Sequence, residues 1–296
     1  MKSLILLSIC AALFTMTAHS QVLKTSRTDV AISHDDNNEV SAKITQSALP
    51  PLTAVSALKF SGLSMVNKVG RNLDVDTATV PEDIWETGGV YPGFPDTLGE
   101  TIQCFSASAS DTAAGTGART ITLVGLDADY AVQSESFTLN GTTPVTGTKI
   151  FVRAHTARVT SAGSGAVNAG IITCRHSTTT ANVFLTIPLG FNQSNCSAYT
   201  IPAGYVGYIV KMHGQVRGGS TGAVDGSLWV RNFGEVFRGR RPFVISNASD
   251  YVMEIPGALT LPQKSDVIVR ASLATSNNLE VVFGYDLLLI KNGIIP

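Results

Sequence analysis

The sequence predicts an all-β protein, with two β-sandwich or jelly-roll-like domains that follow an extended N-terminal arm. Only 15% of the 296 residues are charged, below the roughly 25% of typical soluble domains, whereas exposed helices need Glu and Lys on their wet faces. Short runs of alternating apolar and polar residues recur between turn-forming residues, and no ten-residue helical pattern separates them. Hydrophobic residues make up 44% of the chain, enough for a large core.

The segment 116–145 shows the strand pattern most clearly. Ile121 and Leu123 alternate with threonines, which is the signature of a strand with one buried face. The Asp-rich stretch 125–129 predicts a turn, because Asp side chains bond nearby backbone N–H groups. The pair Asn140-Gly141 predicts a type I′ hairpin turn. Two strands cannot cover a hydrophobic face alone, so more sheet is expected around this segment.

The first twenty residues have the pattern of a secretory signal peptide. Lys2 supplies a positive region, Leu4–Phe14 an apolar region, and Ala18-His19-Ser20 a cleavage site before Gln21. The apolar run is too short to span a bilayer, so no membrane association is expected in the mature form. The alternative is an apolar arm that packs into an assembly. Residues 21–80 are predicted to form an extended arm or linker.

Residues 81–196 are predicted to form the first sandwich domain. It starts with a Gly/Pro-rich loop that contains Trp85 and Tyr91, where aromatic side chains usually anchor a segment onto a sheet. Strand-like runs separated by polar turns follow at 101–106, 119–124, 150–153, 170–174 and 183–187. This spacing is typical of a sandwich or jelly roll.

Residues 197–296 are predicted to form the second sandwich, which is jelly-roll-like. The strand at Tyr199 enters the Pro-x-Gly turn at 202–204, and further strand-like runs follow. The longest run, Leu279–Ile290, ends in continuous apolar residues, which favours a central strand covered on both faces.

Cysteine usage leaves the disulfide pattern open. Cleavage after Ser20 would remove Cys10 and leave Cys104, Cys174 and Cys196. These three thiols allow one disulfide with one cysteine left over, or none. Buried free thiols are the alternative.

No catalytic or metal-binding motif is present in the sequence. It lacks a Gly-x-Ser-x-Gly elbow, a Gly-x-x-x-x-Gly-Lys phosphate loop and a His-Glu-x-x-His zinc helix. His155, His176 and His213 are scattered, as ordinary hydrogen-bonded histidines are. Asp127 and Asp129 resemble the start of a calcium loop, but the required Gly and terminal Glu do not follow. We therefore expect no enzymatic activity, no cofactor and no metal.

The charge distribution bears on the expected partners. The formal net charge of −1 argues against a nucleic-acid partner. The cluster of Arg231, Arg238, Arg240 and Arg241 is most simply a solvated loop, although it suits a carboxylate-rich neighbour or a polyanionic glycan. The candidate contact residues are Trp85, Tyr91, Trp229, Phe233, Arg238, Arg240 and Arg241.

Five short stretches resemble, in order and spacing, a family of structural proteins in tailed-bacteriophage virions that is common in marine phages. They are Glu82–Pro92, Ser108–Thr120, Gly125–Tyr130, Thr138–Thr142 and Tyr199–Gly204. The resemblance covers roughly residues 70–290. It implies a non-enzymatic, β-rich virion component, such as a capsid decoration, head-fibre or tail-associated protein, and it transfers no catalytic residue.

These observations predict a structural protein of a viral particle, located in the virion, whose partners are copies of itself and other virion proteins. The alternative is a secreted or cell-surface adhesin or carbohydrate-binding protein that contacts a host surface glycan. A third hypothesis, a secreted hydrolase, requires carboxylates paired across a cleft. The sequence does not place the candidates Asp127, Asp129, Asp225 and Glu235 in one.

Overall fold

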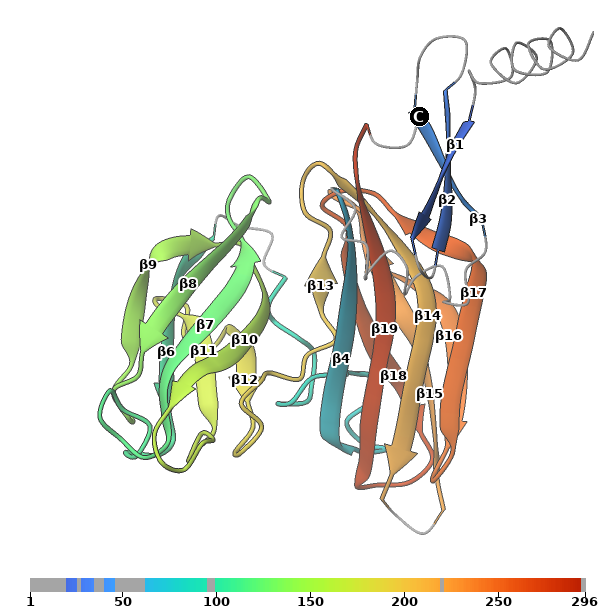
Figure 1. The fold of residues 1–296 in the computed structure, drawn as a ribbon. Helices are drawn as coiled ribbons and strands as arrows, with labels where there is room; N and C mark the ends of the chain where they lie inside the picture. Colours follow the sequence, from blue (N-terminus) through green and yellow to red (C-terminus); the bar gives the residue numbers. More distant parts are fainter. Residues whose placement is uncertain are drawn as a thin grey trace, which may run out of the picture. The chain divides into compact units, whose positions relative to one another are not determined.

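A computed structural model describes residues 20–25, 28–34, 40–45, 62–94, 99–218 and 221–293 (Figure 1). All regular elements of these residues are β-strands, which confirms the predicted fold class. None of them forms a helix that is long and apolar enough to cross a membrane. The chain divides into two compact units, residues 1–61 and residues 62–296.

The described part of the first unit is a three-stranded antiparallel sheet of order β1-β2-β3. Its strands are β1 (Ser20–Thr25), β2 (Thr28–His34) and β3 (Val40–Thr45). Strand pairing gives backbone N–H and C=O groups the partners that an isolated extended arm would lack. The predicted signal segment 1–20 lies outside the described residues, apart from Ser20.

The second unit contains a jelly roll made of two facing sheets. One sheet has the order β17-β14-β19-β4, with β4 (Leu63–Val75), β14 (Tyr205–Arg217), β17 (Asp250–Leu261) and β19 (Leu279–Lys291). The other has the order β13-β18-β15-β16, with β13 (Tyr199–Thr200), β15 (Ala223–Arg231), β16 (Arg238–Ser246) and β18 (Asp266–Ala274); β5 (Glu82–Asp83) also pairs with β18.

The connectivity of these strands is what makes this sandwich a jelly roll. Apart from β15 and β16, which are neighbours in one sheet, consecutive strands alternate between the two sheets from β14 to β19. Apolar side chains from both sheets form one core, including Met212 and Leu287 on one side and Leu228 and Val267 on the other. This agrees with the jelly-roll-like fold predicted for the C-terminal part.

A second sandwich is inserted into the jelly roll between β5 and β13. It consists of β6 (Glu100–Ser106), β7 (Ala118–Leu126), β8 (Val132–Thr138), β9 (Val145–Phe151), β10 (Arg153–Ala162), β11 (Ile172–His176) and β12 (Val183–Ile187). Its sheets have the orders β10-β7-β8 and β12-β11-β6-β9, and they share a core that includes Leu123, Phe137 and Phe184.

The insertion changes how the chain is divided. The sequence patterns predicted two consecutive sandwiches and an arm that includes residues 63–75. These residues form β4, which pairs with β19, and β5 pairs with β18, so the jelly roll uses strands from both sides of the insertion. Asn67 on β4 donates a hydrogen bond to Asp286 on β19, 219 residues away in the sequence. A pattern confined to one stretch of sequence does not contain such a pairing.

The structure tests the two turns that the sequence predicts in the segment 116–145. Asp127 accepts hydrogen bonds on Oδ1 from the backbone N–H groups of Asp129 and Ala131, both at 2.9 Å, which confirms the Asp turn. The prediction of a type I′ hairpin turn at Asn140-Gly141 is wrong. Only Gly141 has a positive φ, 59°, and β8 and β9 on either side belong to different sheets.

Cys104 on β6 lies directly opposite Cys174 on β11, and the two form a disulfide. The third cysteine of the predicted set, Cys196, is a buried free thiol. Adjacent antiparallel strands bring two Cβ atoms to the separation that a disulfide needs. The bridge joins the two central strands of one sheet in the inserted sandwich.

Reducing the disulfide should destabilise the protein. The bridge spans 70 residues, and the chain-entropy model assigns a loop of this size about 4 kcal/mol of unfolding free energy. We expect urea unfolding in the presence of a phosphine reductant to show a loss of about this size in the inserted sandwich. Equal unfolding curves with and without reductant, with the reduced state verified by thiol counting, would contradict the prediction.

Candidate functional site: the junction between the two sandwiches

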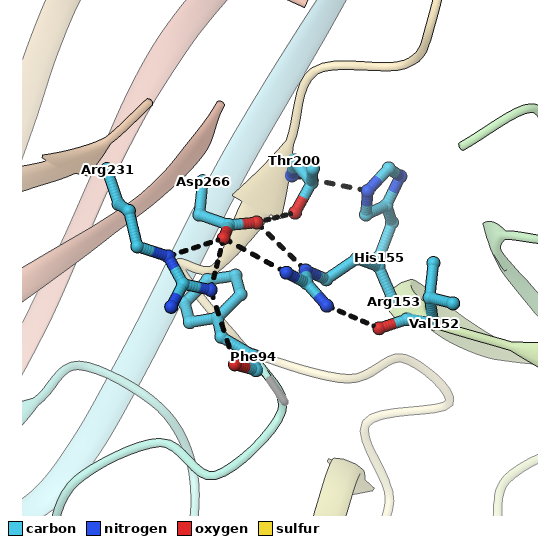
Figure 2. Close-up of polar contacts among 7 residues, drawn as sticks. All are labelled: Phe94, Val152, Arg153, His155, Thr200, Arg231 and Asp266. Carbon is cyan, nitrogen blue, oxygen red and sulfur yellow. Dashed lines mark hydrogen bonds and ion pairs between the residues drawn. The ribbon is translucent and has the colours of Figure 1, made fainter. Parts of the chain in front are cut away.

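Asp266 is the centre of a polar junction between the inserted sandwich and the jelly roll (Figure 2). It begins β18 and is buried. Arg153, which begins β10 of the inserted sandwich, donates to both of its carboxylate oxygens at 2.9 and 3.1 Å. Arg231, which ends β15, donates to Oδ2 at 2.9 and 2.6 Å, and the Thr200 hydroxyl donates to Oδ1 at 2.5 Å. One carboxylate therefore joins strands from both sandwiches.

The two arginines are also held by backbone oxygens. Arg153 donates to the carbonyl of Val152 at 2.7 Å, and Arg231 donates to the carbonyl of Phe94 at 3.3 Å. Burial alone would lower the pKa of Arg153, but the hydrogen bonds and charge of Asp266 raise it, so Arg153 remains a cation. A buried charge of this kind is tolerated because its hydrogen bonds are satisfied.

A second ion pair fastens the entry into the insertion. Arg270 on β18 donates to Asp83 at 2.6 and 3.0 Å, and Asp83 also accepts from the backbone N–H of Tyr91 at 2.8 Å. The Arg270 guanidinium lies 4.8 Å from the centre of the Trp229 ring. The pair thus holds β5 and the following loop against the second sheet of the jelly roll.

A row of aromatic rings extends the core of the inserted sandwich to the junction. Trp85 and Tyr91 pack edge to face at 5.2 Å, Tyr91 and Phe94 at 5.0 Å, and Phe94 lies 5.5 Å from Phe237. Ile268 of β18 belongs to the same buried cluster. Because a jelly-roll strand contributes to this core, the two sandwiches are packed together as well as joined by ion pairs.

Lys68 and His155 form a third, buried connection. Lys68 on β4 donates to the backbone carbonyl of His155 on β10 at 2.6 Å. The His155 ring stacks on Tyr199 at 4.0 Å, and its Nε2 accepts from the backbone N–H of Thr200 at 3.3 Å. Burial lowers the pKa of Lys68, and burial together with the charges of Lys68 and Arg153 lowers the pKa of His155 well below its ordinary value.

An apolar groove lies beside the junction, between β4 of the jelly roll and β11–β12 of the inserted sandwich. It has a volume of about 480 Å³. Its exposed apolar side chains are Leu73, Ile171, Leu189 and Phe191, which are 50%, 49%, 59% and 52% exposed. At its polar end Arg71 pairs with Glu86 at 2.5 Å and stacks 4.4 Å from the Phe191 ring. The groove is therefore apolar, and the pairing of Arg71 with Glu86 neutralises its polar end.

The structure corrects two of the predicted contact residues. Trp85 and Tyr91 are only 4% and 5% exposed and fill the core, so their side chains are not available to a partner. They anchor the loop onto the sheet, which is the other role expected of them. Trp229 is half-buried and lies beneath Arg270, and its buried Nε1 has no hydrogen-bond partner among the described residues.

The remaining predicted contact residues lie at the surface. Phe233 is 61% exposed. Arg238 is exposed and pairs with Glu235 at 2.5 Å, and Arg240 is exposed as well. Arg241 is half-buried with a φ of 50°, at an irregularity in the pairing of β16 with β15. Their role in partner contacts stays a prediction.

The carboxylates and histidines considered for chemistry are dispersed. Asp127 closes its own turn and Glu235 pairs with Arg238. His155 lies at the junction, whereas His176 lies on β11 of the inserted sandwich and His213 on β14 of the jelly roll. In the part of the chain that the structure describes, no group of three or more His, Cys, Asp or Glu residues could hold a metal ion.

Sequence reasoning missed Asp266, Arg153 and Lys68 as junction residues. One signal was present: Asp266 directly precedes the apolar run Val267–Val269 in a strand. A charge at the edge of such a run needs a partner when the strand is buried. The identity of that partner was out of reach, because Arg153 lies 113 residues away.

Comparisons with known proteins show no relative from which a function could be assigned. No protein-family model and no curated protein matches the chain. Weak likenesses occur to a structure of the infectious bursal disease virus Gt strain (8% identity, 94% of this chain and 72% of that chain, TM-score 0.24) and to a mutant VP2 protein of that virus in T=1 particles (8%, 94% and 64%, 0.24). A third is to a VP2 subviral particle (9%, 94% and 66%, 0.23). The chain thus spans about two thirds of these proteins, and TM-scores of this size do not show a shared fold.

Proposed function

We propose that this chain is a non-enzymatic structural protein of a viral particle, which works through repeated contacts with copies of itself and with other virion proteins. Two observations support the proposal. The resemblance of five ordered sequence stretches to tailed-phage virion proteins implies this class, and jelly rolls are an architecture of viral capsid domains. Because lectins and other proteins use the same architecture, the fold alone does not decide the function.

The apolar groove is the observation that carries the assembly role. Four large apolar side chains, each about half exposed, gather in one hollow. Contiguous exposed apolar surface of this kind usually marks a protein–protein contact. Its walls come from both sandwiches, which the ion pairs of Asp266 and Asp83 hold together. A subunit contact there would have a preformed surface.

Replacing Leu189 by Asp tests this role. Leu189 is 59% exposed in the groove, so the change should leave folding intact while a charge enters the proposed contact. We expect self-association, measured by light scattering after size-exclusion chromatography and by electron microscopy, to weaken at least about tenfold. Val236→Asp is the matched control, because Val236 is 70% exposed and is not among the residues that line the groove.

Ordered multimers of the native protein that Leu189→Asp disperses would support the proposal. A stable monomer at all concentrations, or equal assembly of both variants, would count against it. The intact mass of the purified native chain shows in the same experiment whether Met1–Ser20 is retained.

A secreted or cell-surface carbohydrate-binding protein is the second candidate function. A polar hollow of about 280 Å³ is lined in part by Tyr130, Phe233 and Glu235, and Phe233 and Tyr130 pack edge to face at 5.6 Å. Aromatic rings beside a carboxylate are suited to a sugar. Binding of a stable monomer to a glycan array, lost in Phe233→Ala, would favour this candidate over assembly.

A further inference from the structure

We propose that the junction between the two sandwiches is an acid-sensitive latch, in which His155 takes up a proton and releases the inserted sandwich from the jelly roll. The latch is a property of the fold and does not depend on the proposed virion role. His155 lies on β10 of the inserted sandwich. Across the junction it contacts Lys68 on β4 and Tyr199 and Thr200 on β13, all of the jelly roll.

The hydrogen bonds of His155 require a neutral ring. Nε2 accepts the backbone N–H of Thr200 at 3.3 Å, so this nitrogen carries no proton in the closed junction. A proton on Nε2 would point at the Thr200 N–H, which is itself a donor, so the hydrogen bond to β13 would be lost. The ring is buried and stacked on Tyr199 at 4.0 Å, so the closed junction shields it from water.

The charged groups around the ring oppose its protonation. β4 contributes Lys68, whose ammonium is bound to the His155 carbonyl, and β10 contributes Arg153. β13 contributes Tyr199 and Thr200, which are uncharged. The nearby carboxylate of Asp266 on β18 is already shared by Arg153, Arg231 and Thr200. An imidazolium in this place would therefore add a fourth cation to Lys68, Arg153 and Arg231, beside one carboxylate that is already shared.

The direction of the pH effect follows from these contacts. Burial and the two cations hold the pKa of His155 well below 6.5 in the closed junction, whereas an exposed histidine in the open form titrates near about 6.5. Above that pH neither form binds the proton and the latch has its full stability. Below it the open form binds one proton more, so the closed-to-open ratio falls about tenfold per pH unit until the pKa of the closed form is reached.

Other titrating groups must be separated from this effect. Desolvation raises the pKa of Glu100, but the hydrogen bonds from Thr178 and Thr179 together outweigh it and lower the pKa to about 2, so Glu100 loses its charge only in stronger acid. His176 is also buried, and its pKa is lowered by burial. It lies on β11 inside the inserted sandwich, packs on Phe184, and its Nδ1 is 3.6 Å from Glu100 Oε1, so its protonation acts within that sandwich and leaves the junction contacts unchanged.

Hydrogen exchange of the junction between about pH 7.5 and about pH 5 tests the proposal. The backbone N–H groups of Thr200, bound to His155 Nε2, and of Ala203, bound to the Tyr130 carbonyl at 2.9 Å, report on the junction, because both hydrogen bonds join the jelly roll to the inserted sandwich. After correction for intrinsic exchange, wild-type protein should lose protection there about tenfold per pH unit below about 6.5. His155→Gln, whose amide oxygen can still accept from Thr200, should show no such loss, and His176→Gln should behave as wild type at these positions.

Protection that is constant over this range in the wild type, or that falls equally in His155→Gln, would overturn the proposal. If His155→Gln does not fold, the NMR titration of the wild-type His155 ring decides instead. Titration of the ring near about 6.5 while the junction amides stay protected would show that His155 is no latch.

Discussion

Replacing Asp266 by Ala should destabilise the protein by about 3–5 kcal/mol, because it leaves the buried guanidinium of Arg153 and the half-buried one of Arg231 without their shared carboxylate. Arg153, Arg231 and Thr200 all donate to Asp266, from strands of both sandwiches. We expect urea unfolding to show this loss, and the transition should split into two, because the inserted sandwich would no longer unfold together with the jelly roll.

Glu235→Ala is the matched control for Asp266→Ala. Glu235 also pairs with an arginine, Arg238, at 2.5 Å, but both side chains are exposed, and surface pairs contribute about 0–1 kcal/mol. In addition, the double variant Asp266→Ala with Arg153→Met should lose less stability than the sum of the two single variants. Each single change leaves one buried charge of the pair without its partner, whereas the double change removes both charges. Losses below about 1 kcal/mol for Asp266→Ala would show that the junction does not depend on this carboxylate.

Replacing Asp111 by Ala should unfold the loops at one end of the inserted sandwich. Asp111 is fully buried. Its carboxylate accepts from the backbone N–H groups of Ala118, Ala169 and Gly170 at 2.6, 2.8 and 2.9 Å, and from the Ser106 hydroxyl at 2.5 Å. Each donor left unpaired costs about 1–3 kcal/mol, so the total loss should be on the order of 4 kcal/mol or more. Thermal unfolding by calorimetry measures it.

Gly117→Ala should also destabilise the inserted sandwich, although it leaves the Asp111 carboxylate in place. A Cβ at Gly117 would lie 2.0 Å from Asp111 Oδ1 and 2.9 Å from the Cβ of Ala169, so the loop must shift and the Asp111 hydrogen bonds lengthen. Asp129→Ala is the control, because Asp129 is exposed and its loss should change stability by no more than about 0.5 kcal/mol. Equal stability of wild type and Asp111→Ala would refute the role of this carboxylate.

The Asp111 site also explains one of the stretches behind the phage resemblance. In Ser108–Thr120 the aspartate supplies the acceptor, and Gly115 and Gly117 leave room for the backbone around it, since a Cβ at Gly115 would lie 2.0 Å from the Ser110 carbonyl. The stretch therefore has a structural reason. A similar stretch in another protein predicts a similar loop and carries no information about a reaction.

Local patterns predicted the strands well where the partner strand was nearby or the alternation was strict. The Asp turn at Asp127 and the alternation of Ile121 and Leu123 in β7 needed only their own neighbours in the sequence. The type I′ turn at Asn140-Gly141 failed because the same dipeptide also fits a turn between strands of different sheets. Trp85 and Tyr91 were expected both to anchor the loop and to contact a partner. The sequence could not decide between these roles, because it does not show how much of an aromatic ring the rest of the protein covers.

The all-β class, the turn-rich loops and the presence of two sandwiches follow from residue types and their periodicity, because a strand's buried face is encoded in consecutive residues. The insertion of one sandwich into the other, the Cys104–Cys174 pairing and the junction of Arg153, Asp266, Lys68 and His155 depend on contacts between residues 70 to 219 positions apart. Such contacts satisfy buried charges and thiols only once the sheets have assembled, so no local pattern specifies which partner each residue finds.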